Sequence, residues 1–135
     1  METLLVLAVM LGIFLSGNWL LRRRDRRLAR KRTGQGFDQF LAYFSGESIP
    51  HNKLREVYEY LQSSHSVKDF PVLPTDDLCK VYGICHHEDL DDAVIELAQR
   101  WRADLPRFFD LERPAPVRSV ADLVHFLARL PSQND

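Results

Sequence analysis

The chain has 135 residues, of which 45% are hydrophobic and 27% are charged, and its formal net charge is −1. Setting aside an apolar N-terminal segment and its basic flank leaves about 100 residues, which suffice for one small hydrophobic core. This length excludes a second core, and the sequence shows no internal repeat and no low-complexity tract beyond an arginine-rich run.

The apolar segment covers residues 3–21. As a helix it would extend about 28 Å, close to the roughly 30 Å hydrocarbon core of a bilayer, so we expect residues 1–21 to form a transmembrane anchor. The alternatives are a cleaved export signal and a buried core helix. A signal peptide would carry its positive charge before the apolar run, whereas only Met1 and Glu2 precede this one.

Eight cations follow the apolar run, and they indicate a cytoplasmic location for the rest of the chain, where positive flanks are retained. They are Arg22, Arg23, Arg24, Arg26, Arg27, Arg30, Lys31 and Arg32. We expect a single-pass protein of the inner (plasma) membrane with its N-terminus outside. Such clusters also occur in nucleic-acid binding, but the position beside an apolar span favours membrane orientation and attraction to anionic lipid, so no nucleic-acid partner is expected.

Charge divides sharply at residue 33. Residues 1–32 hold eight basic and two acidic side chains, a net charge of +6, whereas residues 33–135 hold ten basic and seventeen acidic ones, a net charge of −7. An acidic domain is repelled by anionic lipid and attracts basic protein partners. We divide the chain into the anchor, a basic stalk with a flexible glycine-containing joint at 22–36, and an acidic helical domain at 37–131.

Apolar residues recur at spacings of three and four through most of this domain, which predicts short amphipathic helices. The first is expected at residues 37–46, and the second begins with Pro50 near its first position and runs to about residue 62. Residues 63–74 are expected to form a loop that places Phe70, Val72 and Leu73 on the core. Thr75 is expected to cap a short helix that ends at Gly83.

The clearest helix follows, with an acidic first turn and arginines in its last. Its apolar face consists of Leu90, Ala93, Val94, Leu97, Ala98 and Trp101. After Pro106, one turn is expected at 108–111 and an extended connection at 114–116, and Ser119 is expected to cap a final helix that ends near residue 130. No strand is expected. The predicted fold is therefore all-α, a small bundle of four to five helices after one transmembrane helix.

Two segments resemble acyl carrier proteins, and the resemblance covers roughly residues 50–130. Residues 83–92 read Gly-Ile-Cys-His-His-Glu-Asp-Leu-Asp-Asp, which is similar to the family's Asp-Ser-Leu entry to its second helix. Residues 117–124, Val-Arg-Ser-Val-Ala-Asp-Leu-Val, are similar to its Thr-Val-x-Asp-Leu-Val entry to the last helix. The resemblance implies a carrier-like fold and an acidic second helix that meets basic enzyme surfaces.

The attachment serine of that family is missing. Aligning the motif places Asp89, or Asp91 after a shift of two residues, where the serine would carry phosphopantetheine. No serine occurs from residue 67 to residue 118, so no prosthetic group or other cofactor is expected. An aspartate here would accept hydrogen bonds from the first turn of the helix.

The acidic turn is the candidate partner-binding surface, made of Glu88, Asp89, Asp91 and Asp92. Asp91 and Asp92 fall outside the apolar face and are expected to be exposed. Exposed neighbouring carboxylates do not converge on a cleft, so no catalytic residue is assigned. We expect a non-catalytic, membrane-anchored interaction module that binds a basic protein.

The alternative function is a small metal-binding protein or thiol-dependent enzyme that uses Cys79, Cys85, His86 and His87. The spacing of the two cysteines lacks the tight pattern of structural zinc sites, so no metal is expected. A cytoplasmic location makes a disulfide unexpected, and the cysteines are interpreted as small core residues. His125 lies beside the apolar face of the last helix and is expected to be a packed or boundary histidine and not a ligand.

Overall fold

The computed structural model describes residues 1–105 and 116–133, and this part of the chain is entirely helical apart from turns, loops and two isolated β-bridges. The six helices in it are α1 (Glu2–Lys31), α2 (Phe37–Tyr43), α3 (His51–Ser64), α4 (Leu78–Tyr82), α5 (His87–Trp101) and α6 (Val120–Ala128). The all-α prediction is confirmed for these residues. The turn expected at 108–111 and most of the connection at 114–116 lie outside the described residues.

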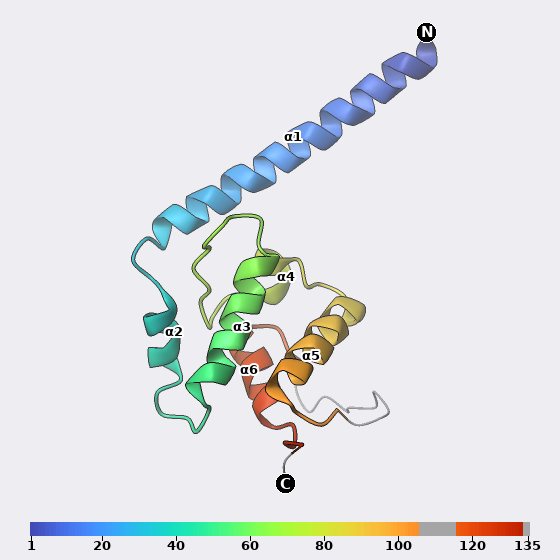
Figure 1. The fold of residues 1–135 in the computed structure, drawn as a ribbon. Helices are drawn as coiled ribbons and strands as arrows, with labels where there is room; N and C mark the ends of the chain where they lie inside the picture. The colour runs from blue at the N-terminus through green and yellow to red at the C-terminus, as the bar shows by residue number, and fades with distance from the viewer. Residues whose placement is uncertain (106–115, 134–135) are drawn as a thin grey trace.

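Helix α1 combines the predicted anchor and the basic stalk in one continuous helix of 30 residues. It is long and apolar enough to span a membrane, and none of its residues is buried. Figure 1 shows its N-terminal part extending away from the other helices, whereas its C-terminal part passes close to them. The remaining helices therefore form a core without using the apolar half of α1.

The core is built where α3, α5 and α6 pack together, with α2 covering α3 (Figure 1). Its largest fully buried side chains come from the five helices α2 to α6, from the C-cap of α2 and from the loop before α4: Phe40, Phe44, Leu54, Leu61, Phe70, Leu78, Leu97, Leu123 and Leu127. The predicted apolar face of α5 is buried along its whole length. The apolar spacing thus identified the packing faces correctly.

The helix ends follow from local side-chain chemistry. Asp77, and not Thr75 as expected, caps α4, because its carboxylate accepts a hydrogen bond from Lys80 N at 2.9 Å. Gly83 ends α4 in the left-handed region, at φ 72°, as predicted. Pro50 is the N-cap of α3 and precedes its first turn.

Helix α6 begins with the predicted cap at Ser119. Its hydroxyl accepts a hydrogen bond from Asp122 N at 3.1 Å, and the Asp122 carboxylate accepts one from Ser119 N at 2.9 Å. Burial raises the pKa of this carboxyl, but backbone hydrogen bonds from Ser119 and Arg118 outweigh that effect and the net pKa is lowered. This reciprocal capping fixes the start of the closing helix.

Candidate functional site

The predicted partner surface lies at the start of α5. Glu88, Asp89 and Asp92 are exposed, whereas Asp91, which was also expected to be exposed, is half-buried. Glu88 and Asp92 stand four residues apart and therefore on the same side of the helix. The exposed carboxylates on this side of the acidic turn are thus those of Glu88 and Asp92.

Asp89 caps the helix that it opens. Its carboxylate accepts a hydrogen bond from the backbone N–H of His86 at 3.2 Å, and His86 is the N-cap residue of α5. A carboxylate in this turn also stabilises the helix through its dipole. Asp89 therefore has a structural role at the start of α5.

At the C-terminal end of α5, acidic side chains are paired with a cation. Arg100 pairs with Glu96, at 2.6 Å between Nη2 and Oε1, and with Glu56 of α3, at 3.4 Å between Nη1 and Oε2. These exposed pairs contribute little to stability, but the single charge of Arg100 offsets part of the charge of the two carboxylates. The negative charge that α5 offers to a partner is therefore concentrated at its start.

A shallow surface depression adjoins the acidic turn. It lies between the α4–α5 connection and the chain that enters α6, and its lining is mostly apolar: Ile84, Cys85, His86, His87, Leu90, Pro116 and Val117. A partner that met the carboxylates of Glu88 and Asp92 would find apolar surface next to them. Such a combination of charge and adjacent apolar area is typical of protein interfaces.

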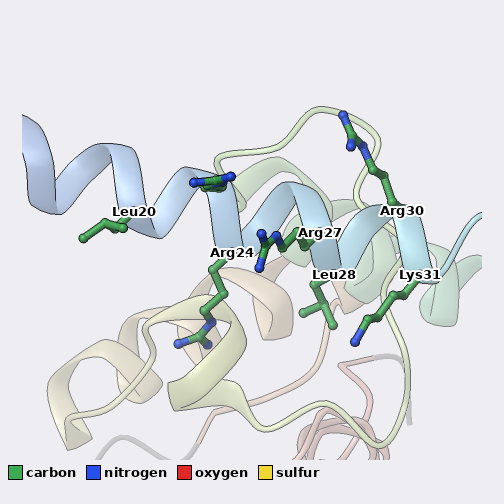
Figure 2. A pocket seen from close by; sticks show the side chains of 7 residues that line it. Leu20, Arg24, Arg27, Leu28, Arg30 and Lys31 are labelled. Atoms are coloured by element: carbon green, nitrogen blue, oxygen red, sulfur yellow. The ribbon is translucent and has the colours of Figure 1, made fainter.

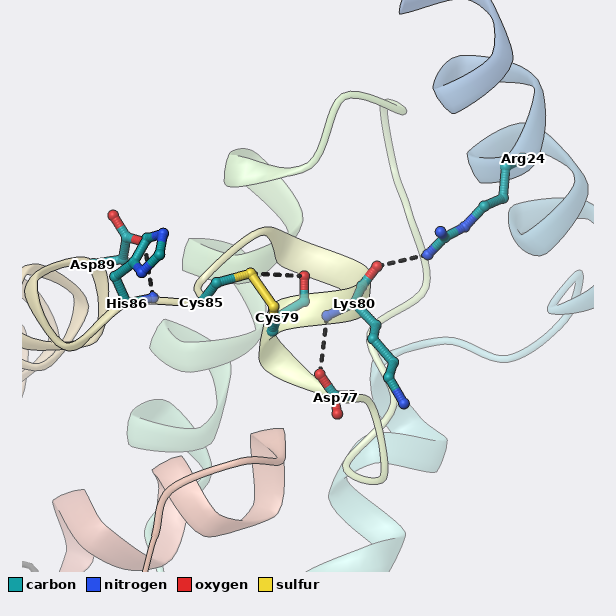
Figure 3. Close-up of a disulfide and its surroundings, with 7 residues drawn as sticks. All are labelled: Arg24, Asp77, Cys79, Lys80, Cys85, His86 and Asp89. Carbon is teal, nitrogen blue, oxygen red and sulfur yellow. Dashed lines mark hydrogen bonds between the residues drawn. A yellow bond between two sulfur atoms is a disulfide. The ribbon is translucent and has the colours of Figure 1, made fainter. Parts of the chain in front are cut away.

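The two cysteines do not behave as predicted. Cys79 and Cys85 form a disulfide, with their Cα atoms 4.3 Å apart, and both residues are exposed (Figure 3). The prediction of two reduced core cysteines is therefore wrong. The α4 helix ends in a tight turn at Gly83, where Gly83 N donates to Cys79 O and Ile84 N to Leu78 O, and this reversal brings Cys85 back to Cys79.

The basic stalk contacts the domain directly. Arg24 donates from Nη2 to the carbonyl oxygen of Lys80 in α4 at 2.7 Å, and Figure 2 shows its side chain reaching from α1 toward α4 while Arg30 points away. An open groove along the stalk is lined by Leu20, Arg23, Arg24, Arg27, Leu28, Arg30 and Lys31. Seven of the eight predicted membrane-orienting cations are exposed.

Arg32 is the exception among these cations, because it faces the domain and is buried. Its guanidinium makes two contacts with the Asp76 carboxylate, Nη1 to Oδ2 at 2.8 Å and Nη2 to Oδ1 at 2.5 Å, and donates to Pro71 O at 2.9 Å. It also lies 5.1 Å from the centre of the Phe70 ring. The joint at 33–36 therefore starts from a fixed point on the domain.

Asp76 is the centre of a buried polar network. Besides Arg32, its Oδ2 accepts hydrogen bonds from the Tyr82 hydroxyl at 2.8 Å and from Leu73 N at 3.0 Å. Its own carbonyl accepts from Val120 N at the start of α6. Burial, followed by the charge of Asp76, raises the pKa of the Tyr82 hydroxyl strongly. Through its carboxylate and its backbone carbonyl, Asp76 therefore connects the stalk, the loop before α4, α4 and α6.

His65 lies beside this network. Its ring stacks on Phe70 with centroids 3.7 Å apart, and its Nδ1 accepts a hydrogen bond from Val67 N at 3.1 Å. Its Nε2 is buried without a hydrogen-bond partner and lies 4.0 Å from an Asp25 oxygen on α1. Burial of the ring lowers the pKa of His65. The positive charge of Arg32 lowers this pKa further, whereas the negative charges of Asp25 and Asp76 raise it, and the net pKa is lowered.

His125 lies at the edge of the core, as predicted. It is half-buried, with Nε2 2.9 Å from both carboxylate oxygens of Glu47 and its ring edge-on to Phe44. Within residues 1–105 and 116–133, no group of three or more histidine, cysteine or acidic side chains is placed to hold a metal ion. With their sulfurs bonded to each other, the cysteines supply no thiolate in this state.

Comparisons with protein-family models, with curated proteins and with solved structures found no match to this chain. The described residues define a small helical protein with one N-terminal helix long and apolar enough to span a membrane. Any closer assignment depends on the residues of the chain itself.

Sequence reasoning missed the network around Asp76 and His65. Both residues lie in or beside a loop without periodicity, so no pattern indicated that their side chains are buried. The sequence held one indication of this network, the position of Arg32. It is the last cation of the run and lies just before the turn at Gly34, where the φ of Gly34 is 87°. A cation at the point where a helix meets its domain is placed to bind that domain.

Proposed function

We propose that the protein is a membrane-anchored, non-catalytic interaction module whose acidic α5 start binds a basic surface of a partner protein. The observation that carries this proposal is the exposure of Glu88 and Asp92 on one side of α5, beside an apolar depression. The domain from residue 33 onward has a net charge of −7, so a basic partner would be attracted at a distance as well as on contact.

The position of the carboxylates favours binding over catalysis. Acid–base chemistry needs groups that converge on a site from which water is excluded, whereas Glu88 and Asp92 lie in solvent at a helix start. The alternative thiol or metal function requires thiolates, and in the oxidised state the Cys79–Cys85 disulfide occupies both sulfurs. Among the residues that the structure describes, no group of three or more histidine, cysteine or acidic side chains surrounds them as a metal site. No observation favours that second function.

The helix order supports the resemblance to acyl carrier proteins. A long helix, α3, is followed by a long loop and the short α4, then by α5 with an acidic first turn and by the serine-capped α6. We propose that the domain is a carrier-like fold without its attachment site, and that Asp89 replaces the serine as a cap. A carrier-like domain without a prosthetic arm would act through the surfaces that it presents.

We further propose that α1 crosses the inner membrane and that the domain lies in the cytoplasm. Seven exposed cations after the apolar segment support this orientation. The contacts of Arg24 and Arg32 with the domain would then hold it near the membrane surface. The carboxylates at the start of α5 would then bind partners close to the bilayer.

The test is affinity capture with the complete chain in native membranes, because Arg32 makes the stalk part of the folded domain. The variant Glu88→Lys with Asp92→Lys reverses the proposed surface. The matched control, Asp38→Lys with Glu59→Lys, makes the same change in charge at exposed positions of α2 and α3, and Asp38 has the same place in α2 as Glu88 in α5.

The proposal predicts proteins that are captured by the wild type and by the control, and at least tenfold less by the α5 variant. Their capture should weaken as salt concentration rises, since the attraction is between exposed charges. Equal capture by all three chains would contradict a role for the acidic turn.

A further inference from the structure

The disulfide between Cys79 and Cys85 closes the connection between α4 and α5. Cys79 is the second residue of α4, Cys85 lies two residues before α5, and Cys85 follows Cys79 by six positions in sequence. Both are exposed, and Figure 3 shows the bond between the short α4 helix and the entry to α5. The bond is therefore open to dissolved thiols.

The segment closed by this bond carries contacts that join distant parts of the fold. The Lys80 carbonyl receives Arg24 of the stalk, and the Tyr82 hydroxyl donates to Asp76. Leu78, the residue directly before the closed segment, is buried, and its N–H donates to Arg118 O at 2.9 Å. Because α4 has only five residues, it is too short to be stable alone and depends on such contacts and on the covalent closure.

The proposed cytoplasmic location of the domain conflicts with a permanent disulfide and is compatible with a reversible one. The cations after the apolar segment indicate a cytoplasmic domain, and permanent disulfides are rare in the cytoplasm, where thiol systems reduce them. Disulfides found there are usually transient and respond to redox conditions. Exposure favours this class, since an attacking thiolate must reach one of the two sulfurs.

We propose that Cys79 and Cys85 form a reversible dithiol–disulfide pair that exchanges with low-molecular-weight thiols, and that its oxidation fixes the α4–α5 connection. This inference rests on the proposed cytoplasmic orientation and does not depend on which partner α5 binds.

The chemistry is ordinary thiol–disulfide exchange. An external thiolate attacks one sulfur, forms a mixed disulfide with it and releases the other as a thiolate, which takes up a proton. A second external thiol then displaces the first, so that two external thiols become one external disulfide and the protein gains two thiols. Two electrons pass from the external thiols to the protein, and the reverse reaction restores the bond.

The first test follows the redox state of the complete chain in membranes. After equilibration in mixtures of reduced and oxidised glutathione that span cytoplasmic conditions, thiols are trapped by acid and labelled with a maleimide mass tag. Cys79 and Cys85 are the chain's two cysteines, so the tags count directly. We expect conversion from no tag to two tags within this range.

A pair that stays oxidised in the most reducing mixture, or reduced in the most oxidising one, would overturn reversibility. Orientation is tested separately in intact cells with a membrane-impermeant phosphine followed by a membrane-impermeant maleimide. Labelling of intact cells would place the domain outside and contradict exchange with cytoplasmic thiols, while leaving the charge-reversal test of α5 unaffected.

The second test measures amide hydrogen exchange in the oxidised and reduced protein. Gly83 N and Ile84 N lie in the closed segment and donate to Cys79 O and Leu78 O. Reduction should therefore speed the exchange of these two amides by roughly tenfold or more. Amides in the centre of α3 serve as the control and should change little. Equal exchange of Gly83 and Ile84 in both states would contradict the claim that the bond fixes this connection.

Discussion

The guanidinium of Arg32 and the carboxylate of Asp76 form a buried two-point ion pair between the end of α1 and the loop before α4. The two side chains are 44 residues apart in sequence. Arg32 therefore joins the long N-terminal helix α1 to the folded core, and the direction in which α1 leaves the domain depends on this contact. Asp76 extends the same connection to α4 through Tyr82 and to α6 through its own carbonyl.

Arg32→Ala should lower the free energy of unfolding by about 3 kcal/mol, because it leaves the Asp76 carboxylate buried without its cation. Arg30→Ala removes an exposed arginine from the same turn of α1 and should cost no more than about 0.5 kcal/mol. Urea unfolding can be followed by the fluorescence of buried Trp101 in a Trp19→Phe background. Equal effects of the two substitutions would show that the ion pair does not stabilise the domain.

Tyr82→Phe should lower the free energy of unfolding by about 1–2 kcal/mol near neutral pH, because it removes a hydroxyl donor to a buried carboxylate. The raised pKa of Tyr82 also makes stability depend on alkaline pH. Its ordinary value is 10.0, so the unfolded chain ionises first and wild-type stability should fall as pH rises above about 10. The Phe variant should lose less stability over this range in the same urea assay.

His65 should make the domain less stable in acid. Its pKa is lowered from 6.5 in the folded state, so the unfolded chain binds more protons below about pH 6.5 and stability falls as pH drops through that value. His65→Phe keeps a ring against Phe70 and should flatten this dependence by up to about 1.4 kcal/mol per pH unit. His51→Gln, at an exposed histidine, should leave the slope unchanged, and a wild-type slope in His65→Phe would exclude the buried imidazole as its source.

The chain should not accept a phosphopantetheine arm. Residues 67–118 contain no serine, and Asp89, at the aligned position, cannot supply the hydroxyl that attacks coenzyme A. Incubation with a phosphopantetheinyl transferase and coenzyme A should leave the mass of the intact protein unchanged. An adduct with the mass of the arm would mean that the alignment of Asp89 with the family serine is wrong.

The sequence predicted the helices well because burial follows apolar spacing. The six buried residues of α5 are those expected from their positions, and the caps at Gly83 and Ser119 follow from short-range chemistry. Asp89 was likewise expected to cap its helix, and it does. These features depend on neighbours within about one helical turn, which a sequence displays directly.

Contacts between distant segments were not predictable in the same way. Nothing near Asp76 indicates that its partner is Arg32, since the pairing depends on how α1 returns to the domain through the turn at Gly34. The disulfide was rejected on the basis of compartment, whereas the tight turn after α4 brings the cysteines together. Asp91 was expected to be exposed and is half-buried, because a position next to an apolar face lies at the edge of the buried side of its helix.

The central claim is that the start of α5 is bound by a partner protein, and site-specific photo-crosslinking in living cells tests it most directly. A photoreactive amino acid is placed at Asp92 in one chain and at Asp38 in a control, both exposed positions on helices that carry part of the core. We expect a discrete crosslinked product of higher mass from position 92 and no such product from position 38. Adding Glu88→Lys should abolish the product from position 92. Equal crosslinking from both positions, or none from position 92, would contradict the central claim.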